Sequence, residues 1–212
     1  MAGGKTMTYK LIAFDFDGTL ADSMACFLQA LEVSARHHGF RSLDGELLTQ
    51  ARGQSARDIM RLLGVPLWKV PALTIEMRRL MRERIAQIRL FPGVAGTLDA
   101  LSERGVKLAI ATSNAEDLVR TVLGLAASQR IAHFSCGISM FGKTRKLQAL
   151  LSSAGVRPNE ALYVGDEIRD AEAARAAGMA FRGVAWGYTA PEALQLQCGE
   201  KLLACPADLL VL

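Results

Sequence analysis

Two acidic residues, Asp15 and Asp17, directly follow the apolar run 11–14. Side chains two residues apart on a strand share a face, so a strand continued through these positions directs both carboxylates to one site. Two close carboxylates rarely ionise together, which favours one as an anionic nucleophile and the other as a proton carrier. An ordinary Asp-Gly turn at a strand end is the competing interpretation.

Polar residues also follow three later strand-like runs. They are Thr112, Ser113 and Asn114 after 106–111, Gly142 and Lys143 after 134–139, and Gly165 and Asp166 after 161–164. Ligands of open parallel sheets bind beyond the carboxyl ends of the strands. We therefore expect these residues to meet Asp15 and Asp17 at one edge of a sheet.

The elements that would hold these residues alternate along residues 94–185. The pattern predicts helices near 94–104, 115–124, 145–154 and 168–177, and strands near 106–111, 134–139, 161–164 and 180–185. Such alternation is typical of an α/β fold, a Rossmann-like parallel sheet with helices on both faces.

Residues 22–90 instead show helical periodicity throughout, broken by turn residues. We predict a core domain of residues 8–21 and 91–212 with a helical cap, residues 22–90, inserted after the first strand. Segment 22–92 holds eleven Lys and Arg against seven Asp and Glu. A solvated helical surface explains this excess, as does attraction of an anionic small molecule.

Composition narrows the class of protein. The chain has 212 residues, 50% of them hydrophobic and 22% charged, which suits a packed core. It has no apolar run of membrane-spanning length, no secretory signal pattern and no dense basic cluster with aromatics. We expect a cytoplasmic monomer or homodimer that binds neither membranes nor nucleic acid. The four widely spaced cysteines predict neither a zinc site nor disulfides.

Four motifs in this order resemble those of the haloacid dehalogenase superfamily. They are Asp15-Phe-Asp-Gly-Thr19, Thr112-Ser-Asn114, Lys143 placed twelve residues before Gly155, and Gly165-Asp-Glu-Ile-Arg-Asp170. The helical insert resembles the C1 cap of that superfamily, and Trp186-Gly-Tyr188 resembles its phosphoglycolate phosphatase-like members.

The resemblance implies a magnesium-dependent phosphatase that hydrolyses a small phosphorylated metabolite. Asp15 would form an aspartyl phosphate, and Asp17 would protonate the leaving oxygen and then activate water. Magnesium would be held by Asp15, by the Asp17 carbonyl and by Asp166. Lys143 would neutralise charge, while Thr112 and the neighbouring Ser113 and Asn114 would hold phosphoryl oxygens.

Expectations also follow for Asp170, for Glu167 and for the pair Arg52-Gly53. Asp170 is expected to orient Lys143 or a metal-bound water. Glu167 is expected either to support the metal ligands from behind or, as the simpler interpretation, to face solvent. The pair Arg52-Gly53 lies between predicted cap helices and resembles the specificity loop of the family. Arg52 is expected either to bind a second anionic group of the substrate or to be an ordinary surface arginine.

Other functions remain open at this point. Gly137-Ile-Ser-Met-Phe-Gly-Lys-Thr144 satisfies the Walker A pattern of nucleotide-binding proteins, although its bulky residues suit a tight phosphate loop poorly. A sugar phosphomutase would form the same aspartyl phosphate. A noncatalytic regulator that binds phosphate would keep the same residues.

Overall fold

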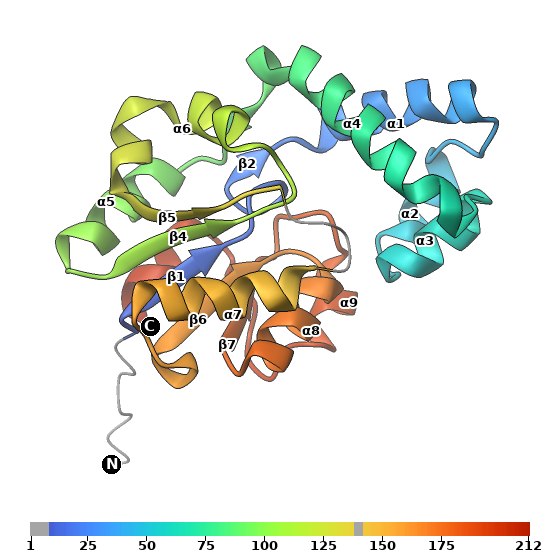
Figure 1. Ribbon diagram of the computed structural model, residues 1–212. Helices are drawn as coiled ribbons and strands as arrows, with labels where there is room; N and C mark the ends of the chain where they lie inside the picture. The colour runs from blue at the N-terminus through green and yellow to red at the C-terminus, as the bar shows by residue number, and fades with distance from the viewer. Residues whose placement is uncertain (1–8, 138–141) are drawn as a thin grey trace.

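A computed structural model describes residues 9–137 and 142–212 of the chain. Its main sheet has the strand order β5-β4-β1-β6-β7, with every neighbouring pair parallel (Figure 1). The strands are β1 (Leu11–Phe14), β4 (Lys107–Ala111), β5 (Ile131–Ser135), β6 (Ala161–Gly165) and β7 (Ala180–Gly183). β1 is buried on both faces at the centre, as its unbroken apolar run requires. The predicted α/β fold is confirmed.

Helices cover both faces of this sheet. They are α5 (Val94–Glu103), α6 (Glu116–Arg130), α7 (Lys143–Ala154), α8 (Ile168–Ala177) and α9 (Pro191–Gln195), with 3-10 helices η3 (Pro158–Glu160) and η4 (Pro206–Val211). Ile12 and Phe14 pack on the side of α5, α6 and η4, whereas Leu11 and Ala13 pack on the side of α7 and α8. This alternation follows from the two-residue period of a strand.

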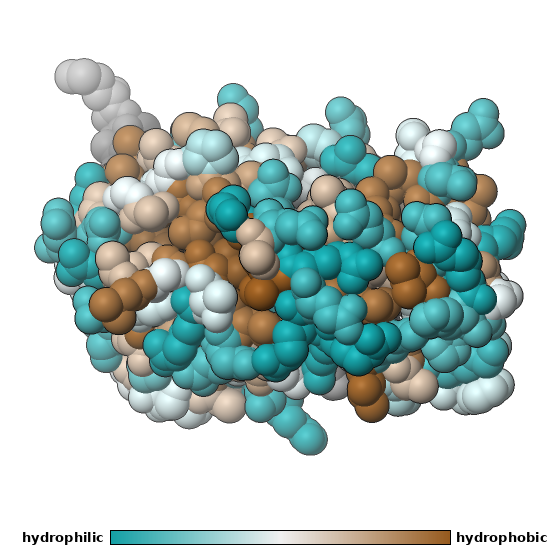
Figure 2. Space-filling view, turned by 90° about the horizontal axis from the view of Figure 1, so that it is seen from above, coloured by the Kyte–Doolittle hydropathy of each residue, from teal (hydrophilic) through white to brown (hydrophobic). Residues whose placement is uncertain are grey.

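The helical segment 22–90, called the cap below, lies to one side of the sheet (Figure 1). It contains α1 (Met24–His38), α2 (Gly45–Ala51), α3 (Ala56–Leu63), η1 (Leu67–Lys69), α4 (Val70–Glu83) and η2 (Ile85–Gln87). Its helices enclose an apolar cluster that includes Leu31, Leu63 and Leu73. In Figure 2 the cap half of the molecule, on the right, shows mainly hydrophilic residues on the face seen from above.

A two-stranded antiparallel ribbon joins the cap to the core. β2 (Ala21–Asp22) pairs with β3 (Arg89–Leu90), so the chain enters and leaves the cap through adjacent strands. The helical periodicity of 22–90 did not predict this ribbon, because two residues per strand are too few to show a period.

The strand that follows α6, β5, begins earlier than predicted. It spans Ile131–Ser135 rather than 134–139, and positions 138–139 lie outside the described residues. α6 continues past a break at Gly124, whose φ is 71°, and runs directly into the strand. β5 lies at the edge of the sheet and is only partly buried, so its apolar signal is weak.

Among the helices formed by residues 9–137 and 142–212, none is both long enough and apolar enough to cross a membrane.

Candidate active site

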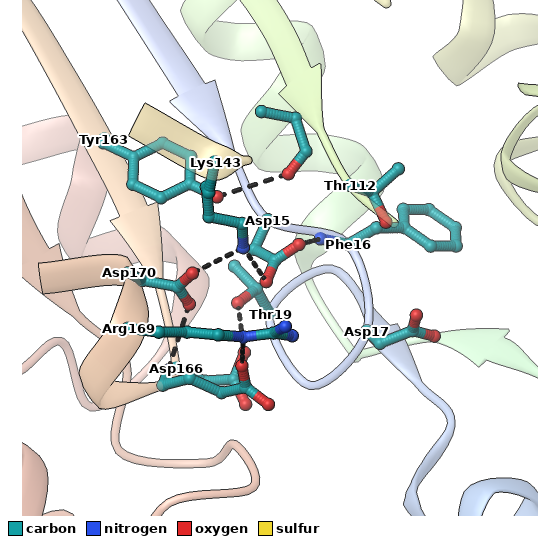
Figure 3. Close-up of polar contacts among 12 residues, drawn as sticks. Asp15, Phe16, Asp17, Thr19, Thr112, Lys143, Tyr163, Asp166, Arg169 and Asp170 are labelled. Carbon is teal, nitrogen blue, oxygen red and sulfur yellow. Dashed lines mark hydrogen bonds and ion pairs between the residues drawn. The ribbon is translucent and has the colours of Figure 1, made fainter. Parts of the chain in front are cut away.

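Asp15 follows β1 at the carboxyl end of the sheet and is 5% exposed. Its Oδ1 accepts a hydrogen bond from the Phe16 backbone N–H at 2.8 Å, and its Oδ2 accepts one from Lys143 Nζ at 2.7 Å (Figure 3). Asp15 also lines a cavity of about 250 Å³ between core and cap. The carboxylate is therefore fixed in orientation while still bordering open space.

Lys143 is the first residue of α7, and its ammonium bridges two buried carboxylates. It contacts Asp15 Oδ2 and also Asp170 Oδ1, the latter at 2.5 Å. Burial alone lowers the pKa of Lys143, but the two carboxylates outweigh burial and raise it above its ordinary value. The Asp170–Lys143 contact expected from the sequence is present.

Asp166 directly follows β6, in the turn that leads into α8, and is completely buried. Its Oδ1 accepts a hydrogen bond from the Thr19 hydroxyl at 2.7 Å, and its Oδ2 accepts one from the Tyr188 backbone N–H at 2.8 Å. Gly18 and Gly187 lie so close to Asp166 that a Cβ at either position would overlap this side chain. Two separate loops, one after β1 and one after β7, therefore converge on Asp166.

Asp17 is placed differently from the prediction. β1 ends at Phe14, so strand geometry does not extend to these positions, and the Asp17 side chain points away from the Asp15–Lys143–Asp170 group in Figure 3. Its Oδ1 accepts from the Ser23 hydroxyl and its Oδ2 from Asn114 Nδ2, both at 2.7 Å. Both Asp15 and Asp17 nevertheless line the same cavity.

The three polar residues after β4 have different surroundings. Thr112 is 1% exposed, and its hydroxyl accepts a hydrogen bond from the Asn114 backbone N–H at 3.2 Å. Ser113 and Asn114 line the cavity. The Asn114 side chain is engaged with Asp17, so it orients a carboxylate in this structure.

Of the pair Arg52-Gly53, only Arg52 belongs to the described cavity lining, and Gly53 is exposed. Arg52 Nε donates to the Tyr188 carbonyl at 2.9 Å, and Nη2 donates to the Gly187 carbonyl at 3.2 Å. Ala190 N–H donates to the Arg52 carbonyl at 2.7 Å. Arg52 thus joins the cap to the core loop that contacts Asp166.

Glu167 does not face solvent as expected. It is partly buried, lines the cavity and forms an ion pair with Arg169. One carboxylate oxygen from each of Asp15, Glu167 and Asp170 lies within 4.8 Å of the others. An acidic side chain in the first turn of a helix normally stabilises the helix N-terminus from the protein surface. Glu167, in the turn before α8, faces inward instead.

The donor set fits a divalent cation. Acidic side chains outnumber basic ones at this end of the sheet: Asp15, Asp17, Asp166, Glu167 and Asp170 against Lys143 and Arg169. Burial, aided by neighbouring carboxylates, raises the pKa of Asp17 to about 6 and that of Asp166 well above its ordinary value. A cation bound by carboxylate oxygens would offset the repulsion between these neighbouring carboxylates, and Mg²⁺ prefers oxygen ligands.

Sequence reasoning missed three residues that hold the acids in place. Thr19 and Tyr188 bond to Asp166, while Ser23 bonds to Asp17 and, at 2.7 Å, to the Tyr188 hydroxyl. Thr19 and Tyr188 lie within sequence motifs that resemble those of the superfamily, and this position in a motif could have indicated their importance. Ser23 gave none, because a lone serine before a helix is most simply a cap.

Comparison with known proteins identifies the family to which this chain belongs. Residues 12–184 match the model of the family described as haloacid dehalogenase-like hydrolase. The chain belongs to this family of hydrolases. The match spans the four motifs between Asp15 and Asp170, and the prediction of the family and of a hydrolase is confirmed.

Individual relatives add detail. The phosphoglycolate phosphatase of Synechococcus elongatus is 34% identical over 202 residues, 94% of each chain. The tyrosine-protein kinase PtkA of Mycobacterium tuberculosis is 29% identical over 84% of this chain and 63% of the kinase. A crystal structure of a candidate phosphoglycolate phosphatase from Lactobacillus plantarum superposes with a TM-score of 0.80, at 25% identity over 96% of this chain and 99% of that one.

The family match leaves the nucleotide-binding alternative without support. Residues Ile138, Ser139, Met140 and Phe141 of the Walker-like segment lie outside the described residues. Its lysine, Lys143, contacts the carboxylates of Asp15 and Asp170.

Proposed function

We propose that this hydrolase is a magnesium-dependent phosphatase that cleaves a small phosphate monoester through an aspartyl phosphate on Asp15. The observation that supports this most directly is the buried Asp15 carboxylate, held by Phe16 N–H and Lys143 Nζ where it borders the cavity. A nucleophile fixed in this way meets phosphorus without first reorganising, which lowers the barrier to attack.

Asp17 is suited to carry the proton. With a pKa of about 6, raised mainly by burial, it exchanges protons readily near neutral pH. Ser23 and Asn114 each donate to one of its oxygens and so fix its direction. In the proposed reaction the protonated form donates to the leaving oxygen, and the ionised form then accepts a proton from attacking water.

The proposed magnesium ligands are Asp15, the Asp17 carbonyl and Asp166, and Glu167 and Asp170 lie close enough to Asp15 to take part directly or through water. When bound, the cation supplies positive charge that neutralises the phosphoryl oxygens and the nucleophile. Lys143 adds a second positive charge beside Asp15. The Thr112 hydroxyl and the amides after β4 are proposed to bind phosphoryl oxygens.

Phosphoglycolate is the first substrate to test, because a relative 34% identical carries that activity in its name. The assay is phosphate release from phosphorylated metabolites with magnesium or with EDTA. Asp15→Asn should lower the rate by about 10⁴-fold or more, because no other group replaces the nucleophile. Asp44→Asn, a matched change at an exposed cap residue, should have no effect.

Two results would contradict the proposal. One is hydrolysis that survives Asp15→Asn or proceeds equally well in EDTA. The other is isomerisation of a sugar phosphate without net phosphate release, which would indicate a phosphomutase.

A further inference from the structure

The cavity that borders Asp15 and Asp17 continues from the sheet end into the interior of the cap. Its described lining includes Asp15, Asp17 and Glu167 at the core and Phe27, Leu43 and Leu73 in the cap. Its volume is about 250 Å³, whereas a water molecule in the liquid occupies about 30 Å³. The cavity is therefore much larger than a phosphoryl group requires.

Most of the described cap residues that line this cavity are apolar. Among the described cap residues that line it, four are polar: Arg52, Gln54, Thr74 and Arg78. The Thr74 hydroxyl donates to the Val70 carbonyl at 2.8 Å, so it is satisfied within its own helix. Arg52 donates to two carbonyls of the core loop, which holds its guanidinium at the cap–core junction.

We propose that the leaving group of the substrate is an apolar alkyl or aryl alcohol that occupies the cap part of this cavity. The proposal rests on the phosphatase function proposed above and specifies the class of its substrate. A cavity of roughly 150 Å³ lined by Leu, Ile and Phe binds benzene, so about 250 Å³ accommodates a six-carbon group with space left toward Asp15.

The competing occupant is a short carboxylate such as that of phosphoglycolate. A carboxylate moved from water into an apolar pocket loses hydration that only a cation or several hydrogen bonds can replace. The remaining N–H groups of Arg52, at the junction, are one place where such a carboxylate could bind. The two occupants therefore predict opposite rankings of substrates.

The test compares kcat/KM for n-alkyl phosphates from methyl to hexyl, for phenyl phosphate and for phosphoglycolate, all with magnesium. Each methylene buried in an apolar wall should raise kcat/KM about fourfold. Phenyl and hexyl phosphate should be better substrates than phosphoglycolate. Asp15→Asn, assayed in parallel, should abolish every one of these activities.

Variants of the wall sharpen the test. Leu48, on α2, lines the cavity and is partly buried. Leu48→Trp should lower the hexyl-to-methyl ratio of kcat/KM at least tenfold, and Leu48→Ala should shift the best chain length upward. Leu67→Trp is the matched control, because Leu67 is 56% exposed and is not part of the lining. Its ratio should equal that of the unaltered protein.

The outcomes separate the two proposals. If kcat/KM stays within twofold along the alkyl series while phosphoglycolate is cleaved best, the apolar-leaving-group inference is wrong and the phosphatase function stands. If no ester is cleaved, or cleavage persists in Asp15→Asn, both proposals are wrong. If the hexyl-to-methyl ratio of kcat/KM is unchanged in Leu48→Trp, the alkyl group does not lie beside Leu48 and the inference is wrong.

Discussion

Beside the sheet end of the cavity, the buried Lys143 ammonium donates to the buried carboxylates of Asp15 and Asp170, whereas the cap end is lined by side chains such as Phe27 and Leu73. The first region holds charge in fixed directions, which suits a developing transition state. The second offers volume without directional contacts, which discriminates substrates by size and polarity. We infer that chemistry and selectivity are divided between the two regions.

The largest effect should come from the charged region. Lys143→Ala removes the ammonium between Asp15 and Asp170, and we expect kcat to fall about 10³-fold, roughly 4 kcal/mol. Steady-state assays with magnesium measure this. Lys146→Ala, three residues later and exposed on the same helix, is the control and should retain full activity. Equal losses in both variants would refute a specific role for Lys143.

The next effect concerns Asp17, whose folded pKa of about 6 is raised, chiefly by burial, from 3.8. Between these pKa values Asp17 binds more protons in the folded state than in the unfolded state, so its contribution to the free energy of unfolding should fall by about 2 to 3 kcal/mol as pH rises from about 4 to 6. Urea unfolding in EDTA measures this. Asp17→Asn should lose that pH dependence, and an unchanged slope would show that Asp17 is not its source.

A smaller effect tests the convergence of loops on Asp166. In Gly187→Ala the new methyl group would overlap the Asp166 side chain, so the free energy of unfolding should fall by about 2 kcal/mol. Gly199→Ala is matched, because no atom lies within 4 Å of a Cβ there. Chemical denaturation of both variants is the measurement. Equal stabilities would mean that the loop at Gly187 shifts without cost.

The smallest effect belongs to the cap. Glu76 accepts hydrogen bonds from His37, Ser34 and His38, which lower its pKa to about 2. This stabilisation is complete above the unfolded pKa of 4.5 and is lost as pH falls toward 2. Glu76→Gln should therefore cost about 1 kcal/mol at pH 7 and less at pH 3.

Urea titrations at the two pH values measure this difference. Glu46→Gln, at an exposed position on α2, is the control. A cost that is independent of pH would contradict the assignment. If the phosphatase activity of Glu76→Gln also stays unchanged, the division between a charged catalytic region and a separately stabilised cap is strengthened.

Local patterns predicted the order of elements well. The buried runs of β1, β4 and β6 and the periodic helices between them appear close to the expected positions. The prediction was wrong at β5, where edge position and partial burial leave little apolar signal, and it missed the β2–β3 ribbon. Both errors occur where neighbours, not the strand's own residues, decide the structure.

The sequence by itself determined the α/β fold, the family and the identity of the residues that follow β1, β4 and β6, because apolar periodicity and motif spacing are properties of the chain. Only the tertiary structure decided that Asp17 points away from Lys143, that Glu167 turns inward and that Arg52 binds the loop of Gly187 and Tyr188. Arg52 and Tyr188 are far apart in the chain, and the directions of the Asp17 and Glu167 side chains depend on how loops pack. No local pattern records that packing.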